Sequence, residues 1–478
     1  MPGTSQIRWN TFFSSLSSLI RLITNFLLFV GIARLYGAEA FGQFTTAHTL
    51  STLFILFADF GFDVLLATEI ARRREQAPLL AQQYLSLKFV FCLVATAAMC
   101  VMPSLQHFSR DTQTLIYIFG FYVFFSSLNN FFFALFKGFE QLHHETKISF
   151  TINILLLCLL VVFGLSHVPI YFIAWFFVGS RILGLLLAYY TAAKVVSRNM
   201  FHLSFSGWKE IMPQILVFGF HSIFGNLFFQ MDTILLSFWK SDYDVGIYQS
   251  VFKIVILALI MQDVLTNTLT PVLSRLSRED KEKWKVLGRL LYKTLLFIAL
   301  PICMVLFVYA DHIVDILYGV EKYREAISIL RIFSTIVLVR YWTEAYALML
   351  TTSQRQKTRM VIALAATLMN YLINAYMIPR YGAFGAALTS LITNIFVGIG
   401  FLLSTRLFFS ARVFEIRKVG LVTLALILSA VLWNLRASSL WVAAPLAVSI
   451  CVFASFYIGY TKEERMLVFA VGKHMSIS

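Results

Sequence analysis

The sequence predicts an all-α polytopic membrane protein with about fourteen transmembrane helices, and two observations lead to this fold class. Of the 478 residues, 59% are hydrophobic and 13% are charged, which leaves too little polar surface for a soluble domain. The hydrophobic residues also gather in repeated runs of about 20, the length of a helix that crosses a ~30 Å hydrocarbon core.

Breaks in hydropathy at Gly, Pro and charged residues define the individual spans. We expect them at 12–34, 44–66, 85–104, 114–136, 148–166, 169–192, 213–238, 246–270, 289–310, 326–350, 358–378, 383–404, 417–435 and 440–460. We expect three parts: an N-lobe over 1–200 (spans 1–6), a C-lobe over 201–410 (spans 7–12), and a C-terminal helix pair with a cytoplasmic tail over 411–478.

The distribution of Lys and Arg predicts the orientation. Connections after even-numbered spans hold 20 of these residues and connections after odd-numbered spans hold seven. Because cytoplasmic loops carry the excess of Lys and Arg, both termini are expected in the cytoplasm. The same asymmetry explains most of the net charge of +15, so the basic character indicates topology rather than nucleic-acid binding. The connections are too short for a folded soluble domain.

The cysteines predict neither disulfides nor a metal site. All five lie inside apolar runs, and none forms a CxxC or Cys/His pattern. We therefore expect no cofactor and no metal. The N-terminal stretch MPGTSQIRWNTFFSS lacks the basic start and small-residue site of a cleaved signal, so its first apolar run is expected to remain as a span.

Similar turns recur along the chain and suggest an internal repeat. Tyr36–Gly42 joins spans 1 and 2, Asp244–Tyr248 lies in the corresponding place between spans 7 and 8, and Tyr381–Gly385 joins spans 11 and 12. Glycine at such turns allows a positive φ or close helix approach. Two six-span halves are a frequent plan in transporters whose site lies at the repeat interface.

The first span carries a polar stripe. Asn10, Ser14, Ser17, Arg21 and Asn25 follow one another at steps of three or four residues, which places them on one helical face. The stripe fits a wall of a water-filled cavity, with Arg21 suited to phosphate. Helix packing through small polar residues is the alternative.

Other spans also hold charged residues. Such residues are energetically costly inside the membrane, and they indicate either a substrate or ion pathway or an ion pair. Arg181 in span 6 needs a wet cavity or a salt-bridge partner. Arg340 and Glu344 in span 10 are four residues apart and can form a local ion pair or a coupling site.

Near the cytoplasmic side, Asp59 and Asp63 of span 2 lie at a depth similar to that of Lys88 of span 3. We expect these three residues to pair and to be structural.

The hydrophobic hairpin Phe218–Leu269 holds Asp232, Lys253 and Asp263. Asp232 and Lys253 are equally far from the turn centre, so a pair across the hairpin is one interpretation. The other makes Lys253 a phosphate anchor facing a cavity with Arg21, and makes Asp232 a carboxylate that exchanges a proton, since a buried unpaired carboxylate has a raised pKa.

Several segments together resemble one known family. They are Ala33–Phe44, Asp59–Phe62, Glu69–Arg72, Met231–Ser237, Val245–Gln249, Pro271–Arg275, Leu317–Gly319, Tyr323–Ala326 and Asn370–Ala387. Over residues 8–405 their order and spacing resemble bacterial polysaccharide transporters, the O-antigen (Wzx-type) flippases. These belong to the multidrug/oligosaccharidyl-lipid/polysaccharide (MOP) exporter superfamily.

The resemblance implies two six-helix lobes around a central cavity, alternating access, and a polyprenyl-pyrophosphate-linked oligosaccharide as substrate. In this interpretation Arg21, Asn25, Arg181, Lys253 and Arg340 bind the pyrophosphate or line the cavity. Ion-coupling candidates are Asp232, Asp263 and Glu344, with a proton or sodium counter-ion.

We expect the bacterial cytoplasmic (inner) membrane as location and the polysaccharide polymerase machinery as a partner. An ion-coupled small-molecule exporter or a peptidoglycan-precursor flippase of the same superfamily is the alternative. An enzyme acting on the lipid carrier is disfavoured, because no cluster of His, Asp or Glu accompanies a plausible nucleophile.

Overall fold

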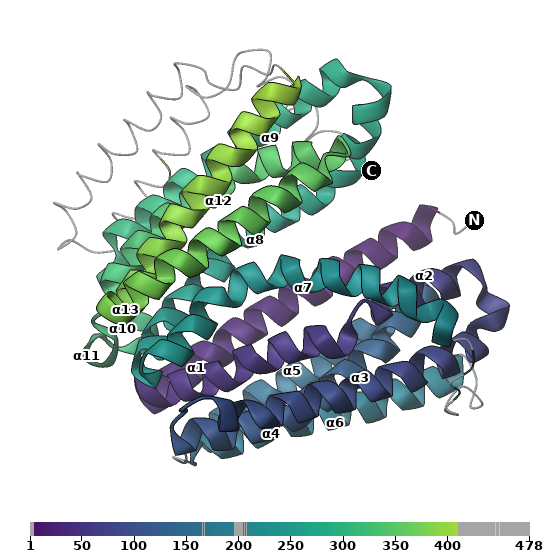
Figure 1. The fold of residues 1–478 in the computed structure, drawn as a ribbon, viewed down its shortest axis with the longest axis horizontal. Coiled ribbons are helices and arrows are strands. Elements are labelled where there is room, and N and C mark those ends of the chain that lie inside the picture. Colours follow the sequence, from purple (N-terminus) through teal and green to yellow (C-terminus); the bar gives the residue numbers. More distant parts are fainter. Residues whose placement is uncertain are drawn as a thin grey trace. The chain divides into compact units, whose positions relative to one another are not determined.

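The fold is all-helical throughout the residues that the computed structural model describes (Figure 1). These are residues 4–409 except 165, 167, 196–203, 205 and 207, together with 445 and 449; the side chains of residues 4–20, 408 and 409, and of several residues in 210–229, are not included. The predicted fold class is confirmed. Predicted spans 417–435 and 440–460 lie outside the described residues.

The first part of the chain supplies predicted spans 1 to 7. Its elements are α1 (Thr4–Asp59), α2 (Phe62–Arg72), the short 3-10 helix η1 (Arg74–Gln76), α3 (Ala77–Leu105), α4 (Arg110–Gly138), α5 (Leu142–Gly164), α6 (Ile170–Val195) and α7 (Trp208–Trp239).

The second part supplies predicted spans 8 to 12. Its elements are α8 (Asp242–Glu279), α9 (Lys281–Val308), the short helices α10 (Ala310–Tyr318) and α11 (Val320–Tyr323), α12 (Ala326–Thr352) and α13 (Gln356–Phe409).

Nine helical segments among the described residues are long and apolar enough to cross a membrane. Two of them, Arg21–Asp59 and Gln356–Leu407, contain 39 and 52 residues, longer than one crossing requires. Each contains a kink at a glycine with positive φ, Gly37 (φ 83°) and Gly382 (φ 53°). These glycines lie in the predicted turns, so each long helix consists of two predicted spans.

The chain divides into two compact units at Ser250, inside α8. In the first unit, α4 packs against α1, α3 and α6, and its aromatic residues Phe131 and Phe136 are almost fully buried. In the second unit, α12 packs against α9 and α13, and Trp284 of α9 donates its indole N–H to Thr352 at 3.1 Å. The lobe boundary near residue 200 stays a prediction.

Free cysteines in the described residues are Cys92, Cys100, Cys158 and Cys303, while Cys451 lies outside them. Within the same residues, no group of three or more His, Cys, Asp or Glu side chains could hold a metal ion.

Candidate functional site

Arg181 of α6 is held by Tyr122 of α4 in the first unit. Its Nη2 donates a hydrogen bond to the Tyr122 hydroxyl at 3.0 Å, and the guanidinium lies 5.2 Å from the centre of the Tyr122 ring. No salt bridge joins Arg181 to any carboxylate in the described part of the chain. Its buried Nε has no hydrogen-bond acceptor there. Since arginine offers five N–H donors in a fixed fork, this guanidinium retains donors for an anion.

The helical position of Arg181 places it on the inward face of α6. It follows buried Phe177 by four residues and precedes buried Gly184 by three, whereas Ile182 and Leu186 on another face are exposed. Arg181 itself is only half-buried. A half-buried cation on an otherwise buried face fits a polar opening on the inner side of the unit.

The surroundings of Arg181 include residues that the sequence analysis missed. His48 of α1 has its ring centre 6.0 Å from that of Tyr122 and 6.2 Å from that of Phe177. Asn129 of α4 donates to the main-chain oxygen of Arg181 at 3.3 Å. Tyr122 and Asn129 share a helical face of α4, because they are seven residues apart. This seven-residue spacing was the one sign in the sequence that Tyr122 and Asn129 lie on the same face of the helix.

Arg21 and Asn25 lie on α1 in the same unit. Arg21 is exposed and Asn25 is half-buried, and Arg21 forms no salt bridge within the described residues. The side chains of Asn10, Ser14 and Ser17, which complete the predicted stripe, lie outside the described residues. The cavity wall therefore stays a prediction, with Arg21 and Arg181 as cations of the first unit that have no carboxylate partner among the described residues.

The hairpin of α7 and α8 is joined by polar hydrogen bonds near its turn. Buried Asp232 accepts from the hydroxyl of Tyr248 at 2.8 Å, and Gln249 donates to Thr233 at 2.7 Å. Lys253 is half-buried and belongs to the second unit. Its predicted pair with Asp232, and its predicted place beside Arg21 as a phosphate anchor facing a cavity, therefore stay predictions.

Two recurring turns meet backbone to backbone inside the first unit. A Cβ added at Gly42 would lie 1.7 Å from the main-chain oxygen of Asp242, and one added at Gly246 would lie 1.8 Å from that of Ala38. The Asp242 carboxylate also accepts hydrogen bonds from Ser109 at 2.8 Å and Thr112 at 3.0 Å. Only glycine permits this approach, so the two turns pack directly against each other.

The second unit brings three predicted residues together. The charge of Arg340 on α12 interacts with the carboxylates of Glu344 and of Asp263 on α8. Glu344 also accepts from Gln262 of α8 at 3.4 Å, and the Tyr341 hydroxyl donates to the main-chain oxygen of Ala258 at 2.7 Å. The predicted local pair of Arg340 and Glu344 stays a prediction, and the charge of Asp263 on a second helix also acts on Arg340. The negative charges of two carboxylates act on this arginine, which makes it a weaker anion site than Arg181.

The predicted pairing of Asp59, Asp63 and Lys88 is confirmed. Lys88 is fully buried, forms salt bridges with both carboxylates, and has its Nζ 3.1 Å from Asp59. Ser127 and Asn130 of α4 donate to Asp59, the latter at 2.8 Å.

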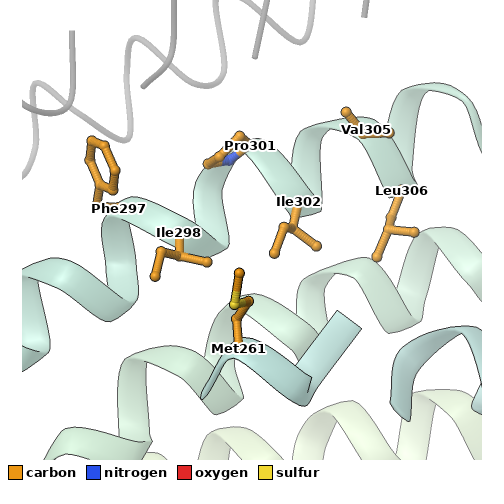
Figure 2. A pocket seen from close by; sticks show the side chains of 7 residues that line it. All are labelled: Met261, Phe297, Ile298, Pro301, Ile302, Val305 and Leu306. Atoms are coloured by element: carbon orange, nitrogen blue, oxygen red, sulfur yellow. The ribbon is translucent and has the colours of Figure 1, made fainter. Parts of the chain in front are cut away.

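An apolar pocket of about 420 Å³ lies between α8 and α9 in the second unit. Figure 2 shows Met261 of α8 facing Ile298 and Ile302 of α9 across it. The lining has no charged side chain, so this pocket suits hydrocarbon rather than an anionic head group.

Comparisons with known proteins give a family and a fold. The family model described as "Polysaccharide biosynthesis protein" matches residues 7–277, and the MatE model matches residues 218–376. A search of curated protein sequences found no match.

Two solved structures have similar folds at low sequence identity. A lipid II flippase MurJ in an inward closed conformation has a TM-score of 0.75 and 15% identity, covering 94% of this chain and 98% of that one. An inward-facing multidrug resistance MATE transporter of the MOP superfamily has a TM-score of 0.68 and 16% identity, covering 80% and 93%.

A third match is a MOP superfamily transporter from Pyrococcus furiosus, with a TM-score of 0.54 and 16% identity, covering 83% and 94%. All three structures are of transporters or a flippase, and the likeness shows that this chain shares their fold. Together with the apolar helices of the described residues and the family model, it supports a multi-pass membrane protein. The chain belongs to the polysaccharide biosynthesis protein family, and its fold is similar to that of MOP superfamily transporters.

Proposed function

We propose that this protein moves polyprenyl-pyrophosphate-linked oligosaccharide repeat units, of O-antigen or a similar surface polysaccharide, across the bacterial cytoplasmic membrane. The family description and the flippase fold support a lipid-linked glycan as substrate. The proposed cytoplasmic position of both termini rests on the distribution of Lys and Arg.

The single observation that carries the proposal is the state of Arg181. It lies within a membrane span, on an inward face, without a carboxylate among the described residues, and with a buried Nε that has no acceptor there. Buried polar groups are normally satisfied, and a charge in a span normally has a partner. A phosphate oxygen of the substrate supplies both the acceptor and the negative charge, and arginine binds phosphate through two parallel N–H donors.

The surroundings of Arg181 suit the rest of the head group. Tyr122 fixes the guanidinium through one N–H and its ring, so less side-chain freedom is lost when the anion binds. Arg21 provides a second cation in the same unit, while Lys253 and Arg340 of the other unit are further proposed contacts. Hydrocarbon excludes the sugar-pyrophosphate, whereas the polyprenyl tail stays in the lipid.

Transport requires that the polar site open to one side of the membrane at a time. The seam between Ala38–Gly42 and Asp242–Gly246 supports a closed end, because backbone contacts backbone there. Its turns follow odd-numbered spans and so belong to the proposed extracytoplasmic side. Exchange of a proton or sodium ion at Asp232, Asp263 or Glu344 would then weaken the binding of the pyrophosphate by the cations, so that the substrate is released. The polymerase machinery would receive the product.

Substitutions at Arg181 test the proposal in a strain lacking the chromosomal gene. We expect Arg181→Ala to lose surface polysaccharide and Arg181→Lys to restore only part of it, because lysine keeps the charge without the planar fork. One charge-assisted hydrogen bond is worth about 1.5–3 kcal/mol, or roughly 10- to 150-fold in affinity. Gly179→Ala on the same helix is the matched control, since its Cβ would contact nothing within 4 Å.

Protein levels in the membrane are measured in parallel. Normal polymer from Arg181→Ala at wild-type protein level contradicts the phosphate role. A deletion that leaves surface polysaccharide intact but reduces drug efflux or peptidoglycan synthesis favours the small-molecule exporter or the peptidoglycan-precursor flippase instead.

A further inference from the structure

The second predicted span is interrupted near its cytoplasmic end. Helix α1 ends at Asp59 and α2 begins at Phe62, and the two residues between them have positive φ, 29° at Phe60 and 82° at Gly61. Glycine adopts this conformation readily, but it is unfavourable for phenylalanine. Such backbone persists only where surrounding contacts enforce it.

Lys88 of α3 supplies those contacts by joining the two sides of the break. Its Nζ bonds Asp59, the last residue of α1, and Asp63, in the first turn of α2. Lys88 is fully buried, whereas the two carboxylates are partly exposed, at 19% and 25% of their side chains. Ser127 and Asn130 of α4 fix Asp59 from the other side. We call Asp59, Asp63 and Lys88 the clamp.

The break also contacts α7. The ring of Phe60 lies against Gly219, where an added Cβ would be 2.3 Å from Cδ1 of that ring. Phe60 shares a buried apolar cluster with Phe62 of α2 and Ile215 of α7. A change in the direction of α2 therefore moves Phe60 relative to α7.

The charges of the clamp do not balance, because two carboxylates share one ammonium. The other titratable side chains acting on it are Cys92 of α3 and Lys137 of α4, and Lys137 is itself paired with Glu145 at 3.4 Å. The two carboxylates repel each other, and one proton bound between them would leave a single negative charge opposite the single ammonium. That proton removes one of the two attractions that hold Lys88 between α1 and α2.

We propose that the break at Phe60–Gly61 is a hinge in the second span, that Lys88 holds it closed, and that a proton taken up by the Asp59–Asp63 pair releases it. When the clamp is released, α2 and the packed part of α7 lose their fixed arrangement. The hinge does not depend on which molecule is transported. A result against the hinge would therefore leave the proposed substrate untouched.

Hydrogen–deuterium exchange of the full-length protein in lipid nanodiscs tests the hinge. Protection factors for amides of residues 62–72 are compared between about pH 8 and about pH 5, after correction for intrinsic exchange. In the wild type we expect severalfold lower protection at the acidic pH. Asp63→Asn, which resembles the protonated acid, and Lys88→Met should show low protection at both pH values.

Two controls separate a hinge from general loosening. Asp111→Asn changes an exposed carboxylate in the first turn of α4 and should behave as wild type. Gly219→Ala leaves the charges intact but displaces Phe60, so it should lower protection of α2 while keeping the pH response. Exchange in α5 should be unchanged in every variant. Equal wild-type protection at both pH values, or wild-type protection in Asp63→Asn, overturns the proposal, as does loosening that extends to α5.

Discussion

Replacing Gly42 by alanine should separate the two turns that meet backbone to backbone in the first unit. The new Cβ would lie 1.7 Å from the main-chain oxygen of Asp242, and real Cβ atoms essentially never approach closer than 3.0 Å. Both sides of the contact are backbone, so no side-chain rotation relieves an overlap of this size. The turns must move apart by more than an ångström.

The expected loss of stability has two parts. Overpacking a tight contact costs about 1–3 kcal/mol. Displacing Asp242 also weakens its hydrogen bonds from Ser109 and Thr112, and a hydrogen bond to a charged group contributes about 1.5–3 kcal/mol. Partial loss of both gives about 3 kcal/mol, which is roughly 6–12 °C in Tm for a unit of this size.

The assay is thermal unfolding of the purified full-length protein in detergent, followed by tryptophan fluorescence. Gly179→Ala is the control, because its Cβ would meet no atom within 4 Å and alanine is preferred over glycine in a helix interior by about 1 kcal/mol. Its Tm should be unchanged or slightly higher. A Gly42→Ala protein that melts within about 2 °C of this control would refute the backbone contact.

Three further outcomes follow from other contacts. Lys88→Met should lower the free energy of unfolding by about 3–5 kcal/mol, because it removes the buried cation that the partly buried Asp59 and Asp63 share. A denaturant titration measures this, and an unchanged midpoint contradicts it. Tyr248→Phe should lower Tm by removing a buried hydrogen bond to Asp232, worth about 1 kcal/mol or more, and Tm equal to wild type would exclude a stabilising bond. Backbone N–H donation at the start of α9 lowers the pKa of the Asp280 carboxyl, so its stabilising contribution is present above the usual carboxylate pKa and is lost as pH falls through the lowered value. Asp280→Ala should therefore reduce Tm at neutral pH and converge with wild type in acid, whereas an equal deficit at every pH would assign the effect to something other than ionisation.

The fold could be predicted from the sequence because membrane spans are recognised by their length and hydropathy. The turns Tyr36–Gly42 and Tyr381–Gly385 were visible as interruptions, and the structure shows Gly37 and Gly382 there with positive φ. The meeting of Gly42 with Asp242 was not visible, since hydropathy carries no information about which turns pack together.

The candidate site was predicted only in part. Charged residues such as Arg181 stand out in an apolar run, and similar depth correctly paired Lys88 with Asp59 and Asp63. The contact of Tyr122 with Arg181 could not be predicted, because aromatic residues are common in membrane spans and most of them only pack against neighbouring helices or lipid. Its role depends on the orientation of α4 against α6, which tertiary packing determines.

The location of lipid-linked repeat units after deletion of the gene shows which molecule this protein transports. Their amount and membrane leaflet can be determined by labelling the glycan in inverted and right-side-out vesicles. We expect the repeat units to accumulate on the cytoplasmic leaflet, and we expect the wild-type gene but not Arg181→Ala to reverse this. Normal delivery of repeat units to the outer leaflet in the deletion strain would contradict it.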